Sequence, residues 1–176
     1  IAAVSKIKVS SKTEGALKGK SLLLKGGEVK KEEPVGIPTG TDITISDLFY
    51  NTPARYKYMK TTNTETGHIS NIITREALVY PAINFKLTHN GKTVFSTPGS
   101  GNLKDVIYSI YGQELVENII PVDYEESYIK LSGFIARPVF YRSSRIYELF
   151  FVNNRSVYNR SLYRGTEEGY RGTLPN

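Results

Sequence analysis

The sequence of 176 residues contains no cysteine. This absence excludes disulfide bonds, thiolate zinc sites and thiol catalysis. Long apolar runs are also missing, because the longest candidate, residues 149–152, is far shorter than the roughly 20 residues of a membrane-spanning helix. No signal-peptide pattern is visible at the N-terminus, and we therefore expect a soluble protein.

Histidine is scarce, with His68 and His89 the only two. Neither lies in a context that would supply the three or four ligands of a transition-metal site, so we expect no metal site. The triplet at 19–21, Gly-Lys-Ser, is similar to the end of a phosphate-binding P-loop, but Glu14 stands where that loop requires glycine. The neighbouring Glu167 and Glu168 would point to different faces of a helix and make a poor acid–base pair. Spacing alone completes no active site.

Positive charge is in excess, since 23 lysine and arginine residues against 17 acidic ones give a net charge of +6. Residues 136–176 hold seven arginines, three glutamates and no lysine. A guanidinium offers a planar fork of donors that suits phosphate oxygens, so this segment is a candidate nucleic-acid surface. The alternative is a solvated, arginine-rich exterior. The chain begins with Ile1 rather than methionine, and we expect it to be a fragment.

The apolar periodicity predicts a mixed α and β chain. Strands are expected at 4–10, 22–29, 41–45, 83–87, 93–96, 118–124, 128–136 and 146–152, with Gly26-Gly27 breaking the second, 41–45 half-buried and 146–152 central in a sheet. Helices are expected at 64–80 and 103–111, in a short segment that Thr52 caps and that carries Arg55, Lys57 and Lys60, and in a last segment capped by Asn159. The charged run at 30–33 is expected to be an exposed connector, and Asn90-Gly91 a two-residue hairpin turn.

One stretch is more specific than these patterns. Residues 40–59 read Gly-Thr-Asp-Ile-Thr-Ile-Ser-Asp-Leu-Phe-Tyr-Asn-Thr-Pro-Ala-Arg-Tyr-Lys-Tyr-Met. This stretch resembles the signature segment of the MutL DNA mismatch-repair family, in which a Gly-Thr strand leads into Leu-Phe-x-Asn-Thr-Pro-Ala-Arg-x-Lys. Residues 1–7, 89–92 and 151–155 are similar, in order, to the family's strand after the ATP lid, its second-domain hairpin and its Val-Asn-Gly-Arg turn. Asn154 stands where that turn has glycine, and because asparagine tolerates left-handed geometry we expect the turn to survive.

The resemblance implies an α+β fold. It comprises the C-terminal part of a GHKL-type ATPase α/β sandwich, followed by most of a ribosomal-protein-like, gyrase-like second domain with a βαβ crossover. Residues 1–60 are assigned to the rear of the ATP-binding domain with its connecting helix, and residues 61–176 to the transducer-like, DNA-binding second domain, truncated at its C-terminus. The family's catalytic glutamate and phosphate-binding motifs would precede Ile1 and its second-domain lysine would follow Asn176, so we expect no ATP hydrolysis by this chain alone.

The resemblance also implies the function of the parent protein. It would be an ATP-binding, ATP-hydrolysing, dimeric and DNA-binding matchmaker that couples mismatch recognition to downstream repair enzymes, with ATP and Mg²⁺ as cofactors. Carried onto this sequence, Gly40 and Thr41 would bind nucleotide, the threonine hydroxyl helping to read adenine through water. The segment joining the domains would couple ATP to domain movement through Asn51, Thr52, Arg55 and Lys57, unless the last two belong to a merely structural helix.

For DNA binding, the resemblance places an implicated arginine at Arg160 and the turn arginine at Arg155, and Arg164 and Arg171 are further candidates. Implied partners are DNA contacted through its phosphates, a mismatch sensor, a downstream endonuclease or helicase and a second copy of the parent, but no membrane. The expected location is the cytoplasm, associated with the nucleoid, in a prokaryote and the nucleus in a eukaryote. Two alternatives stay open, namely a non-catalytic basic interaction module and a gyrase-like topoisomerase fragment.

Overall fold

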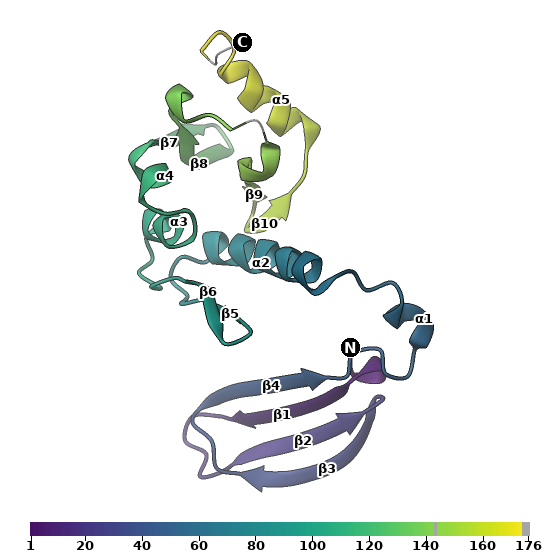
Figure 1. Ribbon diagram of the computed structural model, residues 1–176. Coiled ribbons are helices and arrows are strands. Elements are labelled where there is room, and N and C mark those ends of the chain that lie inside the picture. Colours follow the sequence, from purple (N-terminus) through teal and green to yellow (C-terminus); the bar gives the residue numbers. More distant parts are fainter. Residues whose placement is uncertain (143, 174–176) are drawn as a thin grey trace. The chain divides into compact units, whose positions relative to one another are not determined.

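The computed structural model describes residues 1–142 and 144–173 (Figure 1). The chain divides into two compact units, Ile1–Thr62 and Asn63–Asn176. Helices and strands occur in both units, and every strand pair that the described residues form is antiparallel. The expected mixed class of α and β structure is therefore confirmed.

The first unit is built on one four-stranded sheet with the strand order β3-β2-β1-β4 (Figure 1). Its strands are β1 (Lys6–Lys12), β2 (Gly19–Lys25), β3 (Glu28–Val35) and β4 (Gly40–Ser46). A 3-10 helix at Ala2–Val4 precedes the sheet, and the one-turn helix α1 (Pro53–Tyr56) follows it. Gly26 and Gly27 turn the chain between β2 and β3 with φ of 62° and 90°, which explains the predicted break at this glycine pair.

The charged residues 30–33 lie within β3, so the expectation of a connector is wrong. Seven of the eight residues of β3 are exposed, and Lys31 and Glu33 form an ion pair at 2.7 Å. β3 is an edge strand, and exposed edges commonly carry charged side chains because these oppose pairing with other chains. An edge strand that buries almost nothing has no apolar periodicity by which the sequence could reveal it.

β4 forms the opposite edge and pairs with β1, so that Ile43 lies opposite Val9 and Ile45 opposite Ile7. The predicted alternation is therefore present, since opposite residues of an antiparallel pair share one face. The predicted burial is wrong, because all seven residues of β4 are exposed, Ile43 by 59% and Ile45 by 46%. β4 pairs with β1 alone, so few neighbouring side chains surround Ile43 and Ile45, and both remain exposed to solvent.

The described residues of the second unit form four α-helices, two 3-10 helices (Pro138–Phe140 and Arg145–Tyr147) and three two-stranded hairpins (Figure 1). The helices are α2 (Thr62–Val79, which begins one residue before the unit), α3 (Leu103–Tyr111), α4 (Gln113–Glu117) and α5 (Arg160–Gly169). The hairpins pair β5 (Lys86–His89) with β6 (Lys92–Ser96), β7 (Ile119–Glu126) with β8 (Ile129–Ala136), and β9 (Phe150–Val152) with β10 (Arg155–Val157). Strand β6, helices α3 and α4 and strand β7 follow in strand–helix–strand order, with β6 and β7 in different sheets. None of the helices in the described ranges combines the length and the apolarity needed to cross a membrane.

The core of the second unit forms where α2, β6 and α3 meet. Ala77 and Val106 are completely buried, and Phe95 is 7% exposed. Other apolar side chains pack against these three, namely Ile73, Leu78, Phe85, Leu87 and Ile110. The contact therefore joins helix α2, the β5–β6 hairpin and helix α3 into one body.

Local signals in the sequence set several boundaries in this unit. Asn90 and Gly91 have φ of 49° and 75° and form the predicted hairpin turn. Helix α3 ends at Gly112, whose φ of 85° suits glycine, as predicted. The Asn102 side chain accepts a hydrogen bond from the backbone nitrogen of Lys104 at 2.9 Å and so caps the start of α3.

The apolar run at 146–152 does not form the expected central strand. A 3-10 helix occupies Arg145–Tyr147, and only Phe150–Val152 is extended, in a hairpin with one neighbour. The Ser144 hydroxyl accepts a hydrogen bond from the backbone nitrogen of Ile146 at 3.3 Å. Such side-chain bonds to nearby backbone compete with strand pairing, and they explain why an apolar run became a turn here.

Truncation of Val106 tests the core contact. We expect Val106→Ala to lower the free energy of unfolding of the second unit by about 2 kcal/mol, because the lost methyl groups leave a cavity in a fully buried position. Urea unfolding followed by circular dichroism measures the change. Val139→Ala is the matched control, since Val139 is 82% exposed, and its effect should stay within about 0.5 kcal/mol. Equal effects of the two substitutions would contradict the assigned core.

Candidate nucleic-acid interface

The hairpin of β9 and β10 turns at Asn153 and Asn154, whose φ values are 48° and 62°. Two successive residues of positive φ are typical of a type I′ turn, whose twist matches that of the flanking strands. Asparagine enters this region more easily than most residues because its short polar side chain can bond locally. Asn154 therefore supports the turn without the glycine usual in similar sequences, and Arg155 follows it directly, paired with Val152.

Helix α5 begins at Arg160, five residues after Arg155. The Asn159 side chain accepts hydrogen bonds from the backbone nitrogens of Ser161 at 2.8 Å and Leu162 at 3.4 Å, which confirms the predicted cap. Arg160 is the first residue of the helix, and Arg164 follows four residues on, so the two lie along the same side of α5. Arg155, Arg160 and Arg164 are all exposed.

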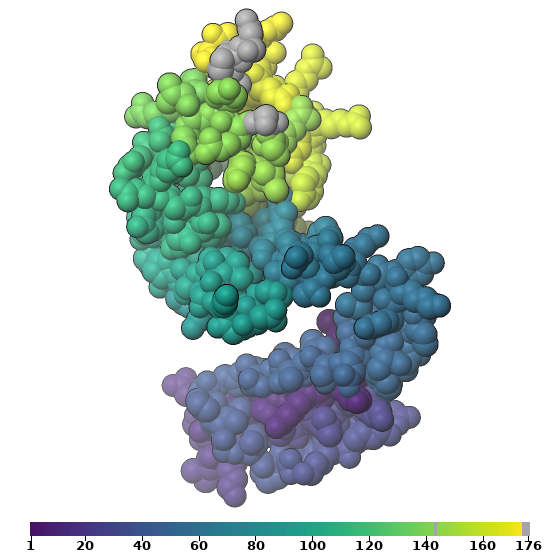
Figure 2. All heavy atoms as spheres, in the orientation of Figure 1, coloured from purple at the N-terminus to yellow at the C-terminus, as the bar shows by residue number. Residues whose placement is uncertain are grey.

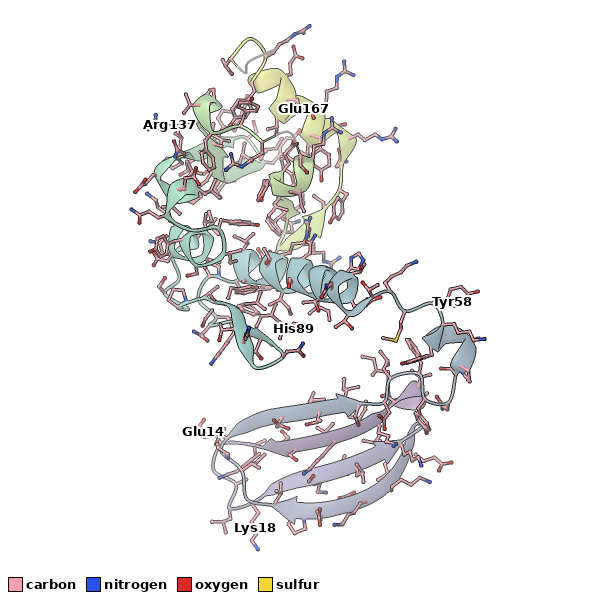
Figure 3. All side chains as sticks on the ribbon, in the orientation of Figure 1. Glu14, Lys18, Tyr58, His89, Arg137 and Glu167 are labelled. Atoms are coloured by element: carbon pink, nitrogen blue, oxygen red, sulfur yellow. The ribbon has the colours of Figure 1, made fainter. Side chains whose placement is uncertain are left out.

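Acidic partners divide the C-terminal arginines into two groups. The Arg145 Nε donates to Glu167 at 2.6 Å, and Arg171 pairs with Glu168 at 2.8 Å. Glu167 lies on α5 (Figure 3). Glu167 and Glu168 thus serve different arginines, as expected for neighbours on a helix. Arg155, Arg160 and Arg164 form no ion pair with any residue in the described ranges, and neither do Arg137 and Arg142. Side chains of this yellow-green segment project from the surface (Figure 2), so its positive charge is open to solvent.

The nucleotide-binding candidates lie in the first unit, at the start of β4. Gly40 has φ of 134°, a conformation that favours glycine, and its carbonyl accepts a hydrogen bond from the Ser11 hydroxyl at 3.2 Å. The Ser11 and Thr41 hydroxyls lie 2.9 Å apart and share a hydrogen bond. Both Gly40 and Thr41 are exposed. A hydroxyl can donate one bond and accept two, so Thr41 retains capacity for a water or a ligand.

The segment expected to join two domains begins with Asn51, whose side-chain nitrogen donates to the Ala3 carbonyl at 2.9 Å. Thr52 occupies the cap position of α1, but its hydroxyl is buried and makes no hydrogen bond, so the predicted side-chain cap is wrong. The physical reason lies in the backbone, because the ψ of 71° at Thr52 departs from the extended conformation that directs a capping side chain at the helix.

Helix α1 is also shorter than predicted. It contains Arg55 and ends at Tyr56, so that Lys57 is its C-terminal cap and Lys60 lies outside it. The backbone nitrogens of residues 58 and 59 bond to carbonyls three residues earlier, at 3.1 and 3.2 Å, which tightens the chain into turns instead of continuing the α-helix. Arg55 and Lys57 are both exposed.

Between β4 and α1 the structure contains a strained turn that the sequence analysis missed. Asp47 and Phe49 have φ of 52° and 65°, and positive φ is exceptional for a bulky residue such as phenylalanine. The Phe49 nitrogen donates to the Val4 carbonyl at 2.7 Å, and Lys6 pairs with Asp47 at 2.6 Å, so contacts with the N-terminal segment hold the turn. Aspartate adopts positive φ more often than most residues, so Asp47 was a weak sequence signal for this turn, whereas a phenylalanine side chain does not favour positive φ.

No group of three or more histidine, cysteine or acidic residues within the described ranges could hold a metal ion. The two histidines are in different environments. His68 is exposed, and the Nδ1 atom of His89 lies 3.3 Å from the Thr66 hydroxyl.

The second unit also contains a cavity of about 340 Å³, lined partly by Tyr111, Tyr147, Glu148 and Tyr170. One carboxylate oxygen of Glu148 is buried without a hydrogen-bond partner. Burial raises the pKa of Glu148, the charge of Glu167 raises it further, and Arg145 opposes both effects. Burial likewise raises the pKa of Tyr111 and of Tyr170.

Proteins of similar sequence indicate the family of this chain. The DNA mismatch repair protein MutL of Halothermothrix orenii is 55% identical over 175 residues, which are 99% of this chain and 27% of the relative. The MutL protein of Anoxybacillus flavithermus is 45% identical over 175 residues, 99% of this chain and 29% of that protein. The sequence profile described as "DNA mismatch repair protein, C-terminal domain" matches residues 107–176. The chain belongs to the MutL family of DNA mismatch repair proteins.

Solved structures support the same assignment. The Aquifex aeolicus MutL ATPase domain complexed with ADP has a TM-score of 0.83 and 26% identity, over 96% of this chain and 65% of that one. A second structure of the Aquifex aeolicus MutL ATPase domain, at 24% identity, has a TM-score of 0.79 over 99% of this chain and 65% of that one. The expected fold is therefore confirmed as that of MutL ATPase domains. The chain spans about a quarter of the length of the MutL relatives.

The left-handed turn of this MutL family member can be tested at Asn154. We expect Asn154→Val to lower the free energy of unfolding by about 1–2 kcal/mol, because a β-branched side chain is strained at positive φ. Asn154→Gly, which accepts the same geometry without strain, should cause no such loss. Thermal and urea unfolding measure both variants, and equal stabilities of the valine and glycine variants would show that the turn is not left-handed.

Glu148 predicts a pH dependence of stability. The pKa of Glu148 in the folded state lies above the ordinary value of 4.5. Ionisation of Glu148 therefore lowers the free energy of unfolding at pH values above this raised pKa, and the destabilisation disappears below about pH 4.5. We expect Glu148→Gln to raise the melting temperature at pH 7 and to leave it unchanged near pH 4. The exposed Glu76→Gln is the control and should change neither value. A melting temperature that falls at pH 7 in Glu148→Gln would refute the assignment.

Proposed function

We propose that this chain carries the rear of the ATP-binding domain, residues 1–60, and most of the DNA-binding second domain, residues 61–176, of a MutL protein. Membership of the MutL family supports this reading, as does the high TM-score with a MutL ATPase domain. The division of the chain into units at Thr62 is consistent with the two parts.

In this proposal the intact protein binds and hydrolyses ATP with Mg²⁺, dimerises through its N-terminal domains and relays mismatch recognition to downstream repair enzymes. It acts where chromosomal DNA is, in the cytoplasm of a prokaryote or the nucleus of a eukaryote. The ADP complex of the Aquifex aeolicus relative supports nucleotide binding. Gly40 and Thr41 would contact the nucleotide, since their polar groups are exposed at the start of β4. Asn51, Thr52, Arg55 and Lys57 would transmit its state along the joining segment.

DNA binding rests on one observation, the exposed arginines that lack acidic partners. Residues 153–165 contain Arg155, Arg160 and Arg164 and no acidic residue. Guanidinium groups in this arrangement suit phosphate oxygens, and phosphate contacts carry no sequence information, so the binding would be nonspecific in sequence and sensitive to salt. Each phosphate that a protein neutralises contributes about 0.9 to the slope of log affinity against log salt concentration.

Charge reversal at Arg160 tests this proposal. We expect Arg160→Glu in the full-length protein to weaken binding to a DNA duplex and to reduce the salt slope by about 1, because one phosphate contact is lost. Fluorescence anisotropy with a labelled duplex, at salt concentrations from 50 to 200 mM, measures both quantities.

The matched control is Arg171→Glu. It changes the net charge by the same amount, but the Arg171 guanidinium is already paired with Glu168. Binding by this variant should retain the wild-type salt slope. If Arg160→Glu leaves both affinity and slope at their wild-type values, the assignment of Arg160 as a DNA-binding residue is wrong.

A further inference from the structure

Arg75 on helix α2 contacts the strand that carries the DNA-binding candidates. Its Nη1 atom donates to the Ser156 hydroxyl at 2.5 Å, across 81 residues of sequence. Its guanidinium carbon lies 4.7 Å from the centre of the Tyr158 ring, within the range of a cation–π interaction. Strand β10 lies beside α2, as Figure 1 also shows, so Arg75 connects a helix of the core to the arginine-bearing hairpin.

The Arg75 side chain is itself held in place on the helix. Its Nε atom donates to the Asn71 side-chain oxygen, one turn earlier, at 2.7 Å. The two hydrogen bonds use different nitrogens of one planar guanidinium, and the single ammonium of a lysine lacks this fixed fork. Arg75 forms no ion pair with a residue in the described ranges, so neutralising an acid is not its role.

The contacted residues lie between the two main DNA-binding candidates. Ser156 and Tyr158 both contact Arg75. Successive side chains of a strand point to opposite faces, and Arg155 and Ser156 are successive residues of β10. Arg155 then points to the other side of β10. Tyr158 is followed by Asn159, the cap of α5, and then by Arg160, so the same anchor also fixes where that helix begins.

The hairpin needs such an anchor. Strands β9 and β10 pair over only three residues each, Phe150–Val152 with Arg155–Val157. A two-stranded hairpin is at best marginally stable in water without packing against other elements. The bond from α2 therefore adds to the ring contact between Phe150 of β9 and Tyr163 of α5, whose centres lie 5.1 Å apart, in holding Arg155 and Arg160.

We propose that Arg75 is a positioning residue for the DNA-binding surface. By holding Ser156 and Tyr158 against α2, it presents Arg155 and Arg160 together to a phosphate backbone without contacting the DNA itself. This inference rests on the proposed DNA binding by Arg155 and Arg160.

The test uses Ser156→Ala in the full-length protein, because this substitution removes the anchor bond but no charge. We expect its dissociation constant for duplex DNA to rise about fivefold, as the loss of one hydrogen bond allows. Arg75→Gln and Arg75→Lys should each weaken binding at least as much, because they also alter the contact with the Tyr158 ring, although lysine keeps the charge. The double variant Arg75→Gln/Ser156→Ala should bind as Arg75→Gln does, because both changes remove the same bond.

Ser161→Ala is the matched control, since Ser161 is an exposed serine beside Arg160 that does not contact Arg75, and it should bind as the wild type does. The positioning role is overturned if Ser156→Ala binds DNA normally. Normal binding by Ser156→Ala and Arg75→Lys, with weaker binding and a smaller salt slope in Arg75→Gln, would instead assign Arg75 a direct phosphate contact.

Amide hydrogen exchange separates the failure of this inference from the failure of the proposed function. In Ser156→Ala and Arg75→Gln, the backbone amides of residues 156–158 should exchange at least several-fold faster than in the wild type, with or without DNA. If they do so while Arg160→Glu leaves DNA binding intact, the anchor exists but the proposed DNA surface is wrong. If exchange is unchanged, the anchor is refuted whatever the DNA-binding result.

Discussion

The buried apolar cluster of Ala77 in α2, Phe95 in β6 and Val106 in α3 fixes how helix α2 is rotated in the second unit. Ala77 and Val106 are completely buried, and Ile73, one turn before Ala77, packs against the same cluster. Residues two apart on a helix point in nearly opposite directions, so a helix that buries Ile73 and Ala77 turns Arg75 away from that core. The apolar contact therefore determines where the Arg75 guanidinium meets Ser156, and the polar anchor depends on the core.

Turns and helix ends were the features most readily predicted from the sequence. Asn90-Gly91, Gly112 and Asn159 act through their own backbone or side-chain geometry within a few residues, so their effect is visible in the local sequence. Burial was predicted less well. The exposed faces of β3 and β4 depend on a strand's place at the edge of a sheet, and pairing partners far along the chain decide that place.

The residues of the candidate site were likewise predicted only in part from the sequence. Arg155 and Arg160 could be predicted as DNA-binding candidates from their residue type and from the family resemblance. The sequence did not show that Arg145 and Arg171 are paired with glutamates whereas Arg155 and Arg160 are not. That difference depends on Glu167 and Glu168, which α5 places beside one arginine 22 residues earlier and another three residues later. Arg75 was missed for a related reason. Its partner Ser156 is 81 residues away, and no periodicity connects an arginine on one helix with a serine on a distant strand.

Net charge explains little of the proposed DNA surface. Residues 63–176 contain twelve basic and eleven acidic side chains, so the second unit is almost neutral as a whole. Exposed charges interact over about 8 Å at physiological ionic strength, and beyond that distance acid elsewhere on the unit is screened. What a phosphate backbone meets is therefore the local composition, and between residues 153 and 165 that composition is three arginines without an acidic residue. In the proposed function, this local segregation of charge would allow a nearly neutral unit to attract a polyanion, with the asparagine turn, the capped helix and Arg75 holding the three arginines in place.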